Sequence, residues 1–78
     1  MLAMQFIEMT GHQLMSVLSE NEATPEELKA SGLTEQCLVR INQQGDIEVR
    51  RSEGWDVIGG LIGEFEKRIK RASGRDWA

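Results

Sequence analysis

The sequence predicts an α+β fold, a small single domain in which two short helices and a β-hairpin precede a C-terminal amphipathic helix (ααββα). Three observations predict this order. Threonine-led capping signals stand at Thr10 and Thr24, apolar and polar residues alternate on both sides of Gly45, and apolar residues recur at helical spacing in the last third of the chain. With 78 residues there is room for one domain, which we place at residues 10–74.

The first predicted helix begins after Thr10. The Thr10 hydroxyl and the Gln13 side chain can each accept a hydrogen bond from the other residue's backbone amide, which makes a capping box. Three apolar residues that share one helical face follow it: Leu14, Val17 and Leu18. The helix should end near Ser19. Residues 1–9 precede the cap and contain three methionines that could each start the chain, so we expect them to form a flexible N-terminal extension.

The second predicted helix spans residues 25–31. Thr24 is its N-cap, Pro25 occupies the first helical position, where a missing N–H costs nothing, and Glu27 completes a second capping box. Gly32 can adopt the left-handed conformation that ends a helix. At barely two turns, this helix needs packing against the rest of the domain to be stable.

The β-hairpin is predicted by alternation. Five apolar residues lie at every second position on either side of a polar turn at residues 42–46: Cys37, Val39, Ile41, Ile47 and Val49. Gly45 supplies the positive φ that such a turn requires. Two strands alone are marginally stable, so a helix must cover their apolar face.

An alternative topology is a helix-turn-helix or winged-helix-like fold. Residues 36–44 would then form a second helix after a turn at Gly32, and residues 46–51 would form a wing strand. Against this reading, Glu35 and Gln36 would stand at the end of the helix that usually meets base edges. The strand alternation also fits better than the helical spacing.

The C-terminal helix is predicted by one apolar stripe at positions i, i+3, i+4, i+7 and i+11: Ile58, Leu61, Ile62, Phe65 and Ile69. Gly74 should end it, leaving residues 75–78 as a short tail. Gly59, Gly60 and Gly63 would lie inside this helix, where each costs about 0.5–1 kcal/mol relative to alanine. Close packing must therefore compensate, either with the chain's own hairpin or with another chain.

Composition excludes several classes of function. Cys37 is the single cysteine and His12 the single histidine, so neither an intrachain disulfide nor a Cys/His zinc site can form within one chain. No phosphate-binding glycine motif is present, and a Cys37–His12 dyad would lack an orienting group. We therefore assign no catalytic, cofactor-binding or metal-binding residues and expect a protein that is not an enzyme. Without a membrane-length apolar stretch or a signal peptide, we expect a cytoplasmic location.

The function expected from these features is a small non-enzymatic protein-interaction or accessory module. Its partner would be a second copy of the chain or an accessory protein, and self-association through the C-terminal helix would produce a homodimer. The predicted contact surface contains four residues: Trp55, Gly59, Ile62 and Gly63. Neither a membrane nor a metal is expected as a partner.

The alternative function is a nucleic-acid-binding or transcription-regulatory domain. It would use the basic residues at the end of the C-terminal helix: Lys67, Arg68, Lys70, Arg71 and Arg75. A net charge of −4 and a pI near 4.9 argue against general binding to a polyanion. We therefore disfavour this alternative.

Overall fold

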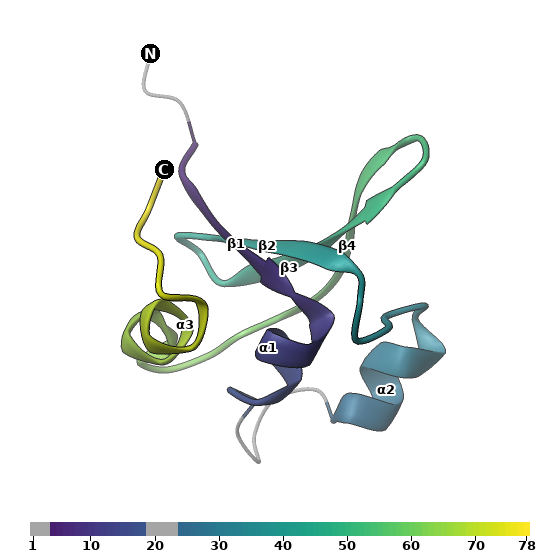
Figure 1. Cartoon of the computed structure of the whole chain (residues 1–78), viewed down its shortest axis with the longest axis horizontal. Coiled ribbons are helices and arrows are strands. Elements are labelled where there is room, and N and C mark those ends of the chain that lie inside the picture. The colour runs from purple at the N-terminus through teal and green to yellow at the C-terminus, as the bar shows by residue number, and fades with distance from the viewer. Residues whose placement is uncertain (1–3, 19–23) are drawn as a thin grey trace.

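The computed structural model describes residues 4–18 and 24–78. Within these residues a four-stranded antiparallel sheet, in the order β1-β2-β3-β4, carries three helices on one of its faces (Figure 1). The elements in chain order are β1 (Phe6–Thr10), α1 (Gly11–Met15), α2 (Pro25–Ala30), β2 (Leu38–Asn42), β3 (Asp46–Arg51), β4 (Gly54–Gly60) and α3 (Phe65–Ser73). The α+β class is confirmed, but the ααββα order is not, because two further strands flank the hairpin.

Strand β1 corrects the expected N-terminal extension. Residues 6–9 pair with β2, and Ile7 and Met9 are buried opposite Ile41 and Val39. Apolar and polar residues do alternate here, but the pairing partner lies some thirty residues downstream. A local pattern therefore could not show that this segment joins the sheet.

The two predicted helix starts are present. Thr10 and Gln13 form the reciprocal capping box, and the Thr24 hydroxyl oxygen accepts a hydrogen bond from the Glu27 amide at 3.2 Å. The first helix is shorter than predicted and ends at Met15, and the residues that were to break it, 20–22, lie outside the described residues. The side chains that follow Met15, including Val17, still pack against the core.

The predicted hairpin is confirmed as β2 and β3. Gly45 has a φ of 90°, and the buried Asn42 side chain holds the turn by accepting hydrogen bonds from the Gln44 and Asp46 amides at 2.9 and 3.0 Å. Because residues 38–42 are a strand, the helix-turn-helix alternative is wrong. Alternation predicted this part of the fold correctly.

The C-terminal helix is only half as long as predicted. Residues 54–60 form strand β4, and the helix α3 begins at Phe65. Aromatic and β-branched residues favour a strand from Trp55 to Ile58, and Gly63, with a φ of 69°, lies in the loop that follows. Of the predicted apolar stripe, Phe65 and Ile69 lie in α3 and pack against the core, whereas Ile58, Leu61 and Ile62 precede the helix.

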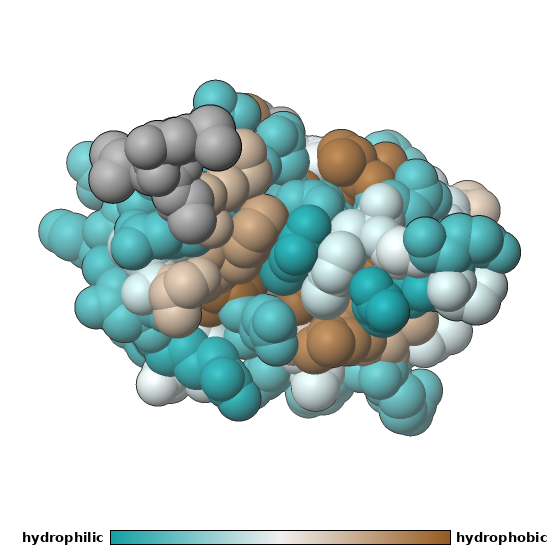
Figure 2. Space-filling view, turned by 90° about the horizontal axis from the view of Figure 1, so that it is seen from above, coloured by the Kyte–Doolittle hydropathy of each residue, from teal (hydrophilic) through white to brown (hydrophobic). Residues whose placement is uncertain are grey.

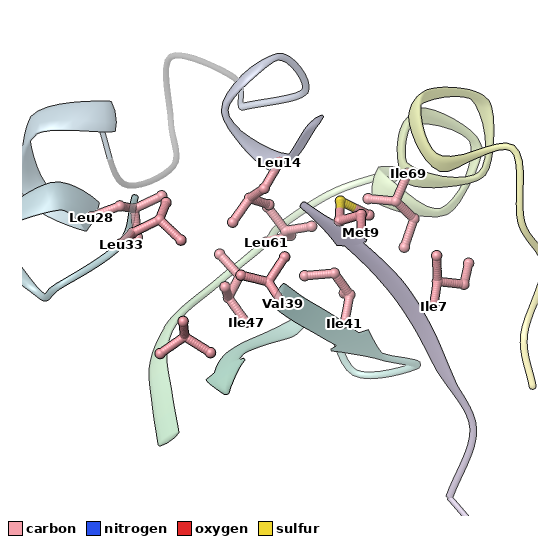
Figure 3. Packing of buried hydrophobic residues seen from close by; sticks show 11 residues of the cluster. Ile7, Met9, Leu14, Leu28, Leu33, Val39, Ile41, Ile47, Leu61 and Ile69 are labelled. Carbon is pink, nitrogen blue, oxygen red and sulfur yellow. The ribbon is translucent and has the colours of Figure 1, made fainter. Parts of the chain in front are cut away.

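The core lies between the sheet and the helices (Figure 3). Alternate residues of β1, β2 and β3 cover one sheet face with aliphatic side chains, and Leu14, Leu28 and Ile69 pack onto it from α1, α2 and α3. Each fully buried side chain of this size contributes about 1.5–3 kcal/mol to folding. All three helices depend on this one face, since none is long enough to be stable alone.

Two glycine substitutions test the packing of the hairpin and of β4. A methyl group on Gly45 would lie 2.7 Å from the Leu61 carbonyl oxygen, at a positive φ, so Gly45→Ala should lower the free energy of unfolding by about 1–3 kcal/mol. At Gly59 the methyl would meet Leu28 Cδ2 at 3.6 Å, an ordinary contact, so Gly59→Ala should raise stability by about 0.4–1 kcal/mol. Urea unfolding measures both, and equal losses would contradict the described position of β4.

Candidate interaction surface

The sheet has a second face, which no described helix covers. We call it the outer face, and it consists of the alternate residues that point away from the core: Phe6, Glu8, Thr10, Leu38, Arg40, Asn42, Asp46, Glu48, Arg50, Trp55 and Val57. Figure 2 looks onto the molecule from the side away from the helices and shows hydrophobic residues scattered among hydrophilic ones.

Arg40 is the centre of the outer face. Its guanidinium carbon lies 3.8 Å from the centroid of the Phe6 ring and 4.2 Å from that of Trp55, and its Nη2 donates to Glu48 Oε1 at 3.0 Å. These four residues, which we call the Arg40 cluster, come one from each strand. The guanidinium of Arg50 adds a longer contact, 5.7 Å from the Trp55 ring.

The Arg40–Glu48 ion pair is shielded from water. Only 23% of the Arg40 side chain and 11% of the Glu48 side chain are exposed. Aromatic rings next to the guanidinium exclude solvent and add cation–π attraction of about 0.5–2 kcal/mol. Arg40 Nε is buried without a hydrogen-bond partner among the described residues, which is an unfavourable contribution that the ring contacts and the ion pair must offset. The cluster is therefore held in one arrangement.

Exposed aliphatic side chains flank this cluster. Met4, Leu38 and Val57 are 59%, 42% and 59% exposed. Leu38 and Val57 belong to the outer face, and Met4 lies beside it, with its sulfur 3.9 Å from Asn42 Nδ2. A rigid Trp/Arg centre with an accessible apolar margin is the composition typical of protein-binding hot spots.

The structure does not bring the predicted contact residues into one groove. Trp55 belongs to the outer face, whereas Gly59 faces the core, where a Cβ would make ordinary contacts with the Leu28 and Ile47 side chains. Gly63 and the 52% exposed Ile62 lie in the loop between β4 and α3. Sequence reasoning found Trp55, and the hairpin alternation places Arg40 opposite Glu48, but the contacts of Arg40 with Phe6 and Trp55 were missed because they join segments that are distant in sequence.

The basic residues of α3 are partly engaged within the chain. Lys70 Nζ lies 3.0 Å from a Glu66 carboxylate oxygen and 3.1 Å from one of Asp76, and Arg68 donates to the backbone carbonyls of Val17 and Ile62. Three further basic residues are exposed: Lys67, Arg71 and Arg75. Two of the five basic residues of the predicted stripe, Arg68 and Lys70, therefore interact within the chain.

The C-terminal residues extend the sheet beside β1. Ala78 exchanges two backbone hydrogen bonds of 3.0 Å with Phe6, and Trp77 packs against the core. Hydrogen bonds from the Lys70 and then the Trp77 side chain lower the pKa of Glu66. The Trp77 amide and then Lys70 lower the pKa of Asp76, and both carboxylates raise the pKa of Lys70.

Other reactive groups lie apart from the outer face. The Thr34 hydroxyl, 3.1 Å from Cys37 Sγ, lowers the pKa of that thiol, and His12 is exposed on α1. Among residues 4–18 and 24–78, no three histidine, cysteine, aspartate or glutamate side chains are grouped to hold a metal ion. No helix in the same ranges is both long and apolar enough to cross a membrane.

Comparisons with protein-family models, with curated proteins and with solved structures found no match to this chain. Its function must therefore be inferred from its own surface.

The Arg40 cluster predicts a large stability effect at one arginine and a small one at another. Arg40→Met leaves the Glu48 carboxylate nearly buried without its cation and should lower the free energy of unfolding by about 2–3 kcal/mol. Arg50→Met, at an exposed position, should change it by less than about 0.5 kcal/mol. Urea unfolding measures both variants. Adding Glu48→Met to Arg40→Met should restore most of the loss, and equal costs for the two arginines would contradict the anchoring role.

The C-terminal attachment should depend on pH. Because Glu66 and Asp76 have lowered pKa values, their contribution is complete above the ordinary carboxyl pKa of about 4 and is lost as the pH falls through the lowered values. The protection factor of the Ala78 amide, which is the intrinsic exchange rate at each pH divided by the rate measured by NMR, should therefore fall at acid pH. In Lys70→Met the protection factor should already be low at neutral pH. A pH-independent protection factor in the unaltered protein would contradict this attachment.

Proposed function

We propose that this protein is a non-enzymatic interaction domain that self-associates through the outer face of its sheet. The observation that carries the proposal is the exposure of Leu38 and Val57 around a rigid Trp/Arg cluster, on a face that no described helix covers. Burial of such side chains at about 25 cal/mol per Å² is the driving force expected for association.

A protein partner suits this face better than a nucleic acid does. Open sheet faces with aromatic residues can stack bases, but they combine this with a positively charged surface. Here two arginines share the face with three carboxylates, those of Glu8, Asp46 and Glu48. The Trp55 ring is also already in contact with Arg40. The nucleic-acid alternative would have to use the exposed basic residues of α3, on the other side of the sheet.

The charge arrangement favours a second copy as the partner. Two outer faces can stack with a two-fold axis parallel to the strands and between β2 and β3. Residues of β2 and β3 then face the copy of their own neighbour on the other of these two strands, and β1 faces the copy of β4. Arg40 is the cross-strand neighbour of Glu48, so each arginine would face a glutamate of the other copy. A pairing that is favourable within the sheet is thus repeated across the interface.

Helix α3 is a weaker candidate for the contact surface than the sheet. Its apolar side is used inside the domain, where Ile69 is buried. Its exposed residues are charged, among them Glu66, Lys67 and Arg71. We therefore place self-association on the sheet and keep Trp55 from the predicted contact set.

Two matched substitutions test this proposal. Leu38→Ser removes an exposed apolar side chain from the outer face, and Ile62→Ser removes one of similar exposure from the loop before α3. Sedimentation velocity from micromolar to millimolar concentration should show a dimer whose dissociation constant rises about tenfold in Leu38→Ser and is unchanged in Ile62→Ser. A strict monomer at millimolar concentration, or a loss of association only in Ile62→Ser, would refute the outer face as the contact.

A further inference from the structure

Strand β4 is an edge of the sheet. One of its sides pairs with β3, and the other has no backbone partner among residues 4–18 and 24–78. The opposite edge differs, since the C-terminal Ala78 exchanges two hydrogen bonds with Phe6 of β1. The described part of the chain thus covers some of one edge with its own backbone and leaves the other edge without a backbone partner.

The open side of β4 is defined by the hydrogen-bonding alternation. The Gly11 amide donates to the Cys37 carbonyl, and the backbone groups of Phe6 bond outward to Ala78. The backbone groups of odd-numbered residues in β2 therefore bond to β1, and those of Arg40 bond to β3. The same alternation continues across β3. The backbone N–H and C=O groups of Asp56 therefore point toward β3, and those of Trp55 and Val57 point away from the sheet. A β-bulge opposite Ile47 and Glu48 ends this regular stretch.

The two sides of this edge differ in chemistry. The Trp55 and Val57 side chains are on the outer face, where Val57 is exposed. The Asp56 carboxylate is on the opposite side, beside Glu53, in a shallow hollow that both residues line. Arg51 Nε lies 3.5 Å from Asp56 Oδ2, but Arg51 Nη2 also donates to the Ser31 carbonyl at 2.7 Å. The guanidinium is therefore shared between Asp56 and Ser31. These two exposed carboxylates favour a positively charged ligand.

We propose that the edge of β4 binds an extended segment of a partner protein in which a lysine or arginine lies between two apolar residues. Its backbone would continue the sheet by bonding to Trp55 and Val57, as in β-strand addition. Its apolar side chains would contact those of Trp55 and Val57, and its basic side chain would reach Asp56. The alternation of the ligand thus matches the alternation of the strand. This binding mode uses the edge and does not depend on self-association through the outer face.

Short synthetic peptides test the inference against the isotopically labelled full chain. A peptide of alternating valine and lysine should shift the NMR amide signals of Trp55 and Val57. Replacing its lysines with glutamates, or methylating the backbone nitrogens that face β4, should each weaken binding at least about tenfold. A protein variant gives the reciprocal result, because Val57→Pro removes an outward N–H that the sheet does not use and should cause a similar loss.

Leu38→Ser separates this inference from the proposed function. Leu38 lies on β2 and not on the edge strand. The Leu38→Ser variant should therefore bind the valine–lysine peptide as the unaltered protein does, even where the variant no longer self-associates. The inference is overturned if no peptide binds, if the glutamate or N-methylated peptide binds as tightly, or if the shifts centre on Leu38 and Arg40. The N-methylated peptide keeps the test valid even where Val57→Pro fails to fold.

Discussion

The guanidinium of Arg40, on β2, connects the four described strands on the open side of the sheet. It packs against Phe6 of β1 and Trp55 of β4 and bonds to Glu48 of β3. A domain of this size buries only about 60% of the surface of its unfolded chain. The described helices all lie on one face of the sheet, and the Arg40–Glu48 pair, packed against two aromatic rings, lies on the other. The same cluster fixes the geometry of any surface that a partner would meet.

The same residues therefore contribute both to stability and to the proposed binding surface. The aromatic rings that shield Arg40 are also the largest apolar groups on the outer face, and Trp55 further belongs to the open edge of β4. A side chain held by several neighbours loses little entropy when a partner covers it, which favours binding. By the same reasoning, exposed positions beside the cluster, such as Leu38 and Val57, affect binding with least effect on folding. Substitutions at the margin of the cluster can therefore test binding separately from folding, whereas substitutions at its centre would change both.

Local signals in the sequence were sufficient where the structure is local. The caps at Thr10 and Thr24 and the turn at Gly45 each involve residues within a few positions of one another, and each was predicted correctly. The outer strands were missed because their identity depends on distant partners. The segment from Trp55 to Gly60 becomes a strand only because β3 is there to pair with it, and β1 needs β2 in the same way. The contacts of Arg40 with Phe6 and Trp55 were missed for the same reason, since they form only once all four strands are in register.

The glycines predicted to weaken a helix have a different meaning in a strand. Gly59 faces the core, but a Cβ there would meet Leu28 of α2 at an ordinary 3.6 Å, so the approach of α2 does not require a glycine. Gly63, with its positive φ, lies in the loop that leads from β4 to α3. The expected compensating close packing is not found: a Cβ at Gly59 would make only ordinary contacts and one at Gly63 would meet nothing within 4 Å. The helix-interior cost that called for it does not apply, because none of the three glycines lies in a helix. The surface left for a partner is consequently on the other side and along the rim of β4, where Trp55 connects the open face to the open edge.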